Sequence, residues 1–495
     1  MRKSGILLSI SSLPSRYGIG DLGKGAYRFV DFLAASSQTY WQILPYAPTD
    51  FVGSPYSSCS AFAGNINYID LEAIARFIDI DLSTIECLES RCVDYNRIRR
   101  VKEDVLKKAA LNFLHRATEG EMKKFEKFTK AASYWLLDFS SFVAFKDYYS
   151  NSGSSEAFNV LFSREILKRD SKALSKLREA FDIDIKIQQV LQYFFFSQFK
   201  ALKSYANAAG ISIIGDMPIF VSYDSADVWA HQKYFKLKFD ASKDKVTGVP
   251  PDYFSREGQL WGSSAYNWKA LRKDNYEWWI NRIGFLQKYV DIVRIDHFRG
   301  FVSTWEVDAG ETTAIKGHWV KCPGKDFLKH LLGKIDNLKI WVEDLGEDLE
   351  DTFKLRDYFN FPGMKVMQFA FDFDAKNPYL PHNYVRNCIV YTGTHDNNTT
   401  RGFIDSLDDK LKMYIFDYFN TDEDSVVWGM IRGAMASVAD SVIVPIQDYL
   451  CLGADFRMNT PGTIFNNWTF KMLDSDLTDA LSKKISDITK LYGRI

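Results

Sequence analysis

The sequence is poor in cysteine, and its cysteines form no recognisable pair. Six occur among 495 residues, with neither a CxxC spacing nor a Cys/His cluster. A disulfide-stabilised secreted domain is denser in cysteine, and a structural zinc site needs more closely spaced ligands. We therefore expect free thiols in a reducing compartment and no metal site.

The chain also lacks a charge surplus and a long apolar run. Its 62 Lys and Arg residues are matched by 63 Asp and Glu residues, which gives a formal net charge of -1. A dedicated binder of nucleic acid or of an anionic membrane would carry a basic surplus. The apolar run at residues 6–10 is too short for a signal peptide, and no stretch approaches the ~20 apolar residues that span a bilayer. The sequence predicts a cytoplasmic protein with no nucleic-acid or membrane partner.

Two enzyme motifs are missing as well. There is neither a GxxxxGK[ST] phosphate loop nor a GxSxG nucleophile turn. These absences argue against a phosphate-handling enzyme and a serine hydrolase, and we expect no cofactor.

Eight short apolar runs predict buried strands, because they are continuous rather than alternating. Amphipathic segments such as 26–35, 276–289 and 326–334 lie between most of them and predict helices. Buried strands that alternate with helices are typical of a TIM-type parallel (β/α)8 barrel, and an open doubly wound sheet is the alternative. The runs are residues 5–10, 40–45, 211–219, 291–296, 339–343, 364–371, 388–391 and 441–445.

The spacing of the runs is uneven, so the single catalytic barrel predicted over residues 1–495 carries two insertions. About 165 residues separate the second and third runs, far more than one crossover helix needs. We predict a mainly helical inserted subdomain at 66–205. A second insertion after the third strand, 222–282, is rich in aromatic residues, glycine and proline. Long loops of this composition usually have a function, and we expect this one to form part of a substrate groove.

Acidic residues stand at the ends of several runs. The C-terminal ends of barrel strands meet at one edge, which is where such barrels place their active sites. For Asp296 alone, an ion pair with Arg294 explains the charge as well as catalysis does. Several acids at neighbouring strand ends predict a site. They are Asp216 (third strand), Asp296 (fourth), Glu343 (fifth), Asp396 (after the seventh) and Asp448 (after the eighth).

Converging carboxylates fit two chemistries. One is a magnesium or calcium site, and the other is glycosyl transfer with one carboxylate as nucleophile and a second as general acid/base. Aromatic residues make up 15% of the chain, and a sugar groove uses aromatic platforms that a metal site does not need. Each aromatic taken singly is more simply a core residue, so the residues alone indicate a carboxylate glycosidase-type barrel and no more. The candidate platforms are Tyr56, Trp229, Tyr253, Phe254 and Trp261.

The same segments resemble the amylomaltases, or 4-α-glucanotransferases, of glycoside hydrolase family 77. The resemblance extends over nearly the whole chain, and residues 250–262 are similar to the family pattern PPDxFSxxGQLWG. The other matching blocks are residues 12–15, 18–23, 41–45, 54–57, 60–65, 215–221, 294–300, 343–346, 361–365, 393–397 and 457–463.

The resemblance implies retaining transfer of an α-1,4-glucan segment to the 4-hydroxyl of an acceptor glucan or glucose. It implies that Asp296 is the nucleophile, that Glu343 is the general acid/base, and that Asp396 is a third acid gripping sugar hydroxyls. It also implies substrate contacts for Tyr56, Asp216, Trp261, Arg294, His395, Ser54 and Asn467.

Three other functions stay open at this point. They are an α-1,4-glucan hydrolase of the same barrel class, a non-catalytic glucan-binding protein, and a metal enzyme. The intact trio of Asp296, Glu343 and Asp396 argues against pure binding, which needs no such set. The expected partners are malto-oligosaccharides and α-1,4-glucans, and the expected assembly is a monomer or homodimer.

Overall fold

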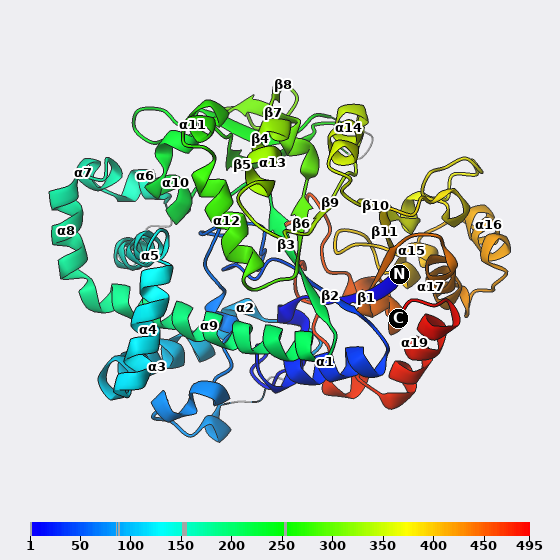
Figure 1. The fold of residues 1–495 in the computed structure, drawn as a ribbon, viewed down its shortest axis with the longest axis horizontal. Coiled ribbons are helices and arrows are strands. Elements are labelled where there is room, and N and C mark those ends of the chain that lie inside the picture. The colour runs from blue at the N-terminus through cyan, green and yellow to red at the C-terminus, as the bar shows by residue number, and fades with distance from the viewer. Residues whose placement is uncertain (1, 86, 88–89, 151–155, 252–254) are drawn as a thin grey trace.

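The computed structural model describes residues 2–85, 87, 90–150, 156–251 and 255–495. Within them, the centre of the molecule is a sheet of eight parallel strands in the order β10-β11-β12-β1-β2-β3-β6-β9 (Figure 1). The Val342 N–H donates to the Pro362 carbonyl at 3.2 Å and so joins the end of β9 to the residue before β10. The sheet therefore returns on itself as a barrel. Its strands are β1 (Lys3–Leu7), β2 (Tyr40–Ile43), β3 (Ser212–Pro218), β6 (Ile292–Asp296), β9 (Ile340–Val342), β10 (Gly363–Val366), β11 (Cys388–Tyr391) and β12 (Ser441–Pro445).

This architecture confirms the predicted TIM-type barrel, and each of the eight predicted runs overlaps a strand. The first and sixth runs extend furthest beyond the ends of their strands. The first run continues into a 3-10 turn at Ile10–Ser12, and the sixth continues into another at Met367–Phe369. Apolar character therefore continues beyond the strand wherever the following turn is also packed against the core.

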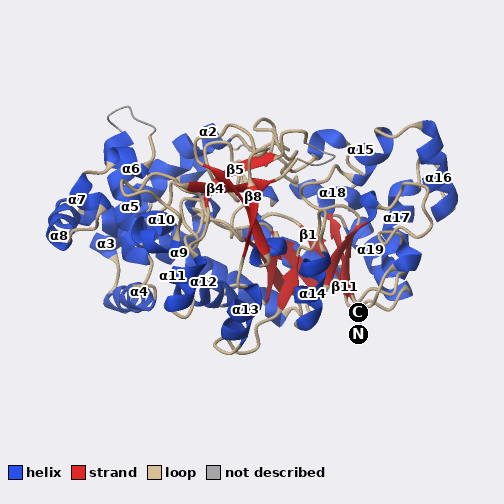
Figure 2. Cartoon of the chain, turned by 90° about the horizontal axis from the view of Figure 1, so that it is seen from above, coloured by secondary structure: helices blue, strands red, loops and turns tan. Residues whose placement is uncertain are grey.

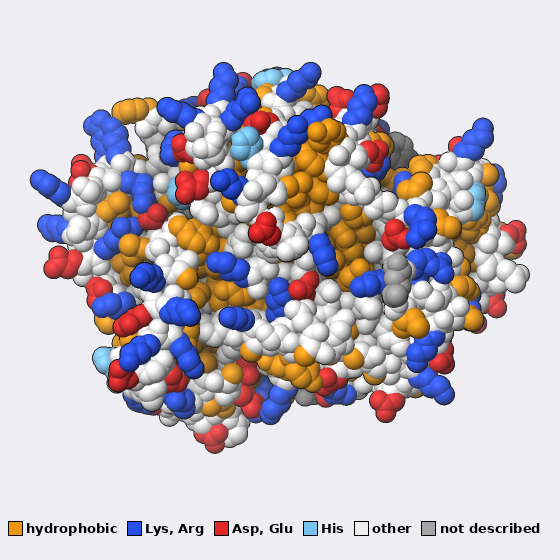
Figure 3. Space-filling view, viewed as in Figure 1, with side chains coloured by type: hydrophobic (Ala, Val, Ile, Leu, Met, Phe, Trp, Pro, Cys, Tyr) orange, Lys and Arg blue, Asp and Glu red, His pale blue; other side chains and the backbone are white. Residues whose placement is uncertain are grey.

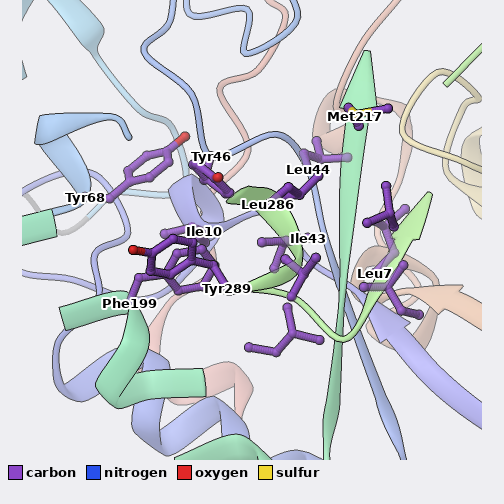
Figure 4. Packing of buried hydrophobic residues seen from close by; sticks show 14 of the residues in the cluster. Leu7, Ile10, Ile43, Leu44, Tyr46, Tyr68, Phe199, Met217, Leu286 and Tyr289 are labelled. Atoms are coloured by element: carbon purple, nitrogen blue, oxygen red, sulfur yellow. The ribbon is translucent and has the colours of Figure 1, made fainter. Parts of the chain in front are cut away.

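The barrel is held by apolar faces of the surrounding helices. In α1 (Lys24–Ala35) the buried residues Ala26, Phe29, Val30 and Leu33 recur at helical spacing. Figure 4 shows the packing between strands and helices, where Phe199 of α9 lies beside Tyr289. These two rings stack at 5.9 Å between centroids.

The connection from β2 to β3 is mainly helical, as predicted. Its last helix, α9 (Asp182–Ala208), runs past the predicted boundary at residue 205 and packs on α1 and β3. The insertion and the barrel thus share one continuous helix. The preceding helices are α2 (Tyr95–Ile98), near the centre of Figure 1, and, on its left, α3 (Asp104–Arg116), α4 (Glu119–Ala131), α5 (Leu136–Ser150), α6 (Phe158–Leu161), α7 (Arg164–Leu167) and α8 (Ser171–Ala180).

The aromatic insertion contains regular structure. It holds α10 (Ala226–Ala230), β4 (Lys245–Val249), β5 (Gln259–Ser264) and α11 (Trp268–Lys273). Strand β4 pairs antiparallel with β7 (Ser303–Asp308), which follows β6, and β8 (His318–Lys321) completes the order β5-β4-β7-β8. Figure 2 shows this second sheet on the side of the barrel away from the two termini.

Three of the predicted aromatic platforms need comment. Trp229 is a core residue rather than a platform, because it is fully buried and packs against Phe142, Phe145 and Phe162. Tyr253 and Phe254 lie outside the described residues.

Residues 18–23 read GxGxxG and precede α1, which is also the layout of a dinucleotide-binding turn. Here the glycines have a packing role. A Cβ on Gly20 would lie 1.9 Å from the Ile10 carbonyl oxygen and 2.6 Å from the Leu13 nitrogen. The pattern is explained by the close approach of the turn to residues 10–13.

The remaining helices cover the barrel wall. They are α12 (Glu277–Gln287), α13 (Gly324–Leu332), α14 (Glu350–Tyr358), α15 (Thr400–Asp405), α16 (Asp409–Phe419), α17 (Val426–Ala436), α18 (Ile446–Tyr449) and α19 (Asp479–Leu491). On the face drawn in Figure 3, basic and acidic side chains are interspersed. Among the helices of the described residues, none has the length and apolarity needed to cross a membrane.

Candidate active site

Three of the predicted acids meet on neighbouring strands. Asp216 lies in β3, Asp296 ends β6, and Glu343 follows β9. Strand β6 pairs with β3 on one side and β9 on the other, with Pro218 opposite Asp296 and Ile295 opposite Val342. The parallel register therefore brings the three carboxyl groups to one point on the C-terminal edge of the barrel.

Arg294, also on β6, binds all three acids. Its Nη1 donates to both oxygens of Asp216 (2.6 and 2.5 Å) and to Asp296 Oδ1 (3.0 Å). Its Nη2 donates to Glu343 Oε2 at 2.9 Å. The Arg294 side chain is only 3% exposed, whereas those of Asp296 and Glu343 are each 22% exposed. The cation is thus buried beneath two carboxyl groups that reach solvent.

The crowding of charge perturbs the ionisation of this pair. Burial and the neighbouring Glu343 charge raise the pKa of Asp296 well above its usual range. Burial also opposes ionisation of Glu343, but the Arg294 charge and the local hydrogen bonds outweigh it and lower the pKa of Glu343 to about 2. The two pKa values are therefore pushed apart, and a proton shared by the pair favours Asp296 over Glu343.

His297 is a site residue that the sequence argument missed. Its backbone is left-handed (φ 50°), and its N–H donates to Glu343 Oε2 at 3.0 Å. Its ring meets Trp261 edge-on at 4.8 Å between centroids. Burial lowers the pKa of the His297 ring to about 4, so it is neutral near pH 7. The available signal was its position directly after Asp296 in the RIDHFRG block.

Trp261 lies on β5 above this edge and keeps 38% of its surface exposed. Besides His297 it contacts the Phe220 ring at 5.9 Å. The second sheet thus brings an exposed indole against His297, the residue that follows Asp296.

Tyr56 contacts Asp216, and Ser54 lies in the same loop as Tyr56. The Tyr56 hydroxyl donates to Asp216 Oδ2 at 2.9 Å, and burial together with the Asp216 charge raises the pKa of Tyr56 well above its usual range. Ser54 acts within its own loop, where its Oγ accepts from the Tyr56 N–H at 3.3 Å. Tyr56 and Asp216 line a hollow together with Phe220 and Arg282.

The loop after β11 carries His395 and Asp396. The His395 ring stacks on Tyr56 (5.1 Å, 17° between planes), and its Nε2 lies 3.4 Å from Asp396 Oδ2. Asp396 is the most accessible of these acids, with 44% of its side chain exposed. Asn459 donates from Nδ2 to Asp396 Oδ1 at 2.6 Å, and no role for it was predicted from the sequence.

Asp448 is a structural acid. Its carboxylate is 1% exposed and accepts from the Thr392 hydroxyl at 2.6 Å and from the Thr400 N–H at 2.7 Å. It therefore ties both ends of the His395–Asp396 loop to the start of α18.

Asn467 stabilises the loop in which it lies by hydrogen bonds to its backbone. Its Oδ1 accepts from the Thr460 N–H at 2.9 Å, and its Nδ2 donates to the Thr463 carbonyl at 2.9 Å. The next residue, Trp468, contacts the rings of Tyr56 (5.5 Å) and His395 (6.0 Å). Contact of Asn467 with substrate stays a prediction. Among the described residues, His, Cys, Asp and Glu side chains form no group of three or more that could hold a metal ion.

Fold and site together define a class of protein. A parallel barrel with two carboxyl groups on one guanidinium at its C-terminal edge is typical of enzymes that cleave glycosidic bonds through paired carboxylates.

Comparison with known proteins identifies the family within this class. A family model for glycoside hydrolase family 77, described as 4-alpha-glucanotransferase, matches residues 8–477. The chain belongs to this family, as the sequence predicted, and is an enzyme of this type.

Individual relatives match over their full length. The 4-alpha-glucanotransferase of Clostridium butyricum is 43% identical over 98% of this chain and 100% of its own length. That of Synechocystis sp. is 44% identical over 100% of this chain and 98% of its own length. The structure of an amylomaltase from Streptococcus agalactiae, in complex with acarbose, superposes with a TM-score of 0.95 at 39% identity, with 100% of both chains covered.

Proposed function

We propose that this enzyme moves an α-1,4-glucan segment between malto-oligosaccharides, with Asp296 as nucleophile and Glu343 as general acid/base. One observation carries the assignment of these roles. The two carboxyl groups accept hydrogen bonds from adjacent nitrogens of the Arg294 guanidinium, so they lie side by side. Retaining enzymes place their carboxyl groups about 5–5.5 Å apart, whereas inverting enzymes leave room for a water between them.

The reaction takes two displacements. First, an Asp296 oxygen attacks the anomeric carbon, the glycosidic C–O bond breaks, and Glu343 gives its proton to the leaving oxygen. The 4-hydroxyl of the acceptor then loses its proton to Glu343 and attacks the same carbon, which releases Asp296. Each step inverts the anomeric centre, so the transfer retains its configuration.

Substrate binding must first move the proton of the pair. Before substrate binds, this proton favours Asp296, because Arg294 and the His297 N–H stabilise the Glu343 carboxylate. When Glu343 turns toward the glycosidic oxygen it loses these hydrogen-bond donors, and its pKa rises. Arg294 then stabilises the ionised form of Asp296 instead. The proton then moves from Asp296 to Glu343 with no change in net charge. Asp296 is left ionised, as a nucleophile must be, and Glu343 is protonated, as a general acid must be.

The remaining predicted residues bind the sugar. Asp396 and His395 grip hydroxyls of the ring at the cleavage point, and Tyr56 supplies a flat face beside Asp216. Trp261 and the 222–282 insertion cover the groove. Covering the covalent intermediate matters for a transferase, because water must be excluded until a sugar acceptor arrives.

The test is incubation with maltotriose alone, with the products resolved by chain length. Transfer yields glucose together with maltopentaose and longer chains, and the number of reducing ends stays constant. Asp296→Asn and Glu343→Gln abolish this activity. Asp291→Asn is the matched control, because Asp291 lies just before β6, at the opposite end of that strand, and pairs with Lys203 at 3.2 Å.

Two outcomes contradict the proposal. A rise in reducing ends without longer chains means hydrolysis. Full activity in Asp296→Asn removes that residue from the chemistry, whatever the products are.

A further inference from the structure

Asn459 contacts the third acid from a distant part of the chain. Besides its 2.6 Å bond from Nδ2 to Asp396 Oδ1, its backbone N–H donates to the His395 carbonyl at 3.0 Å. One residue of the segment after β12 thus binds both the main chain and the carboxylate of the loop after β11.

Arg457 reinforces this attachment. Its Nη2 donates to the Asp396 carbonyl at 2.5 Å, and its Nε donates to the Asn459 carbonyl at 2.6 Å. Both bonds end on backbone oxygens. The cation therefore fixes the main chain of the two segments, while a neutral amide holds the Asp396 carboxylate itself.

The contrast with the other acids has a physical meaning. Asp216, Asp296 and Glu343 all bind the Arg294 cation, which offsets their charge. A neutral N–H orients a carboxylate without forming an ion pair with it, so the carboxylate keeps more of its charge to stabilise positive charge that develops on a nearby sugar ring. Exposed carboxylates otherwise turn about two torsions, and Asp396 is the most exposed of the four.

We propose that Asn459 is a positioning residue of the transfer reaction, whose side-chain amide holds the Asp396 carboxylate in its working orientation. This inference rests on the proposed function, because it assumes that Asp396 acts on the sugar in the transition state. It adds a residue to which the sequence argument gave no role.

The test compares Asn459→Ala and Asn459→Asp in maltotriose disproportionation across pH. Losing a hydrogen bond to a charged group costs about 10- to 100-fold, and we expect the loss in kcat with little change in KM. If Asn459→Ala does not fold, Asn459→Ser replaces it.

The Asn459→Asp variant has its own expected pH dependence of kcat. At low pH the two adjacent carboxyl groups share a proton, and its O–H replaces the amide N–H as donor. As pH rises the proton is lost and two like charges face each other. The kcat of this variant, relative to the wild type at the same pH, is therefore highest at low pH and falls as pH rises. The other titratable or charged groups facing Asp396 are His395, Arg457 and Tyr56. They are present in both proteins, so the ratio removes their contribution.

The matched control is Asn383→Asp, which adds the same charge where an amide donates to the Ala375 and Asn377 carbonyls at 2.9 Å each. It leaves the pH profile unchanged. The inference is overturned if Asn459→Asp keeps the wild-type kcat, or if its loss is the same at every pH. A wild type that does not transfer maltotriose would instead refute the proposed function.

Discussion

Replacing Arg294 by lysine keeps the buried positive charge but removes the two guanidinium nitrogens that bind different acids. In the native site Nη1 donates hydrogen bonds to Asp216 and Asp296, and Nη2 donates one to Glu343. An ammonium group is a single point on a flexible stem. We expect it to stay with Asp216, the most buried of the three acids, and to release Glu343 and Asp296.

The magnitude follows from the hydrogen bonds to Asp296 and Glu343, which the lysine cannot make while it stays with Asp216. A hydrogen bond to a charged group contributes about 1.5–3 kcal/mol, so two such bonds give about 3–6 kcal/mol. Because Asp296 and Glu343 are each 22% exposed, water replaces part of this. The lower end, about 3 kcal/mol, corresponds to a fall of about 100-fold in kcat/KM.

The assay is kcat/KM for maltotriose disproportionation from pH 4 to 9, with thermal unfolding as the check on folding. Without Nη2, the pKa of Glu343 rises from about 2, so an acid limb that lies below pH 4 in the wild type moves into the measured range. A folded Arg294→Lys enzyme that keeps more than a tenth of wild-type kcat/KM would refute the reasoning, as would a variant profile with the same acid side as the wild type.

Three further predictions concern the groove and the stability of the fold. Trp261→Ala opens the groove to water, so the share of hydrolysis, measured as new reducing ends per bond cleaved, rises about tenfold; an unchanged share would count against the groove assignment. Burial and the Asp21 charge raise the pKa of Asp70 to about 6, so its ionisation lowers the stability of the fold as pH rises from about 4 to 6. Asp70→Asn therefore raises the thermal midpoint of unfolding by about 1–2 °C at pH 7.5 but not at pH 4. Buried Arg494 donates to the carbonyls of Met435 and Ala439 (2.7 and 2.9 Å), so Arg494→Ala lowers the midpoint by about 3–5 °C and leaves kcat intact; calorimetry checks both stability changes.

The strands and the buried acids could be predicted because their signals are local. A continuous apolar run marks a barrel strand wherever it occurs, and a carboxylate at its end falls on the C-terminal edge by geometry alone. Asp216, Asp296 and Glu343 were found in this way, without any knowledge of what surrounds them.

What the sequence could not supply depends on contacts between distant segments. Nothing near Asn459 in the chain indicates that its amide reaches Asp396, and nothing near His297 indicates a left-handed backbone aimed at Glu343. Trp229 shows the opposite error. An aromatic residue in a glycine- and proline-rich insertion predicted a groove, but the helices of the first insertion bury it completely.

The four-stranded sheet beside the groove is built from two stretches of chain, one on each side of the strand that carries Asp296. A chimera that exchanges only 222–282 for the equivalent stretch of a relative would pair a foreign β4 with a native β7, along the register from Lys245–Asp308 to Gly248–Trp305. Any property that this sheet gives to the groove is therefore exchanged as a unit, and the smallest exchangeable cassette extends from the end of β3 through β8, with Asp296 inside it. Directed evolution of the groove has to diversify both stretches together.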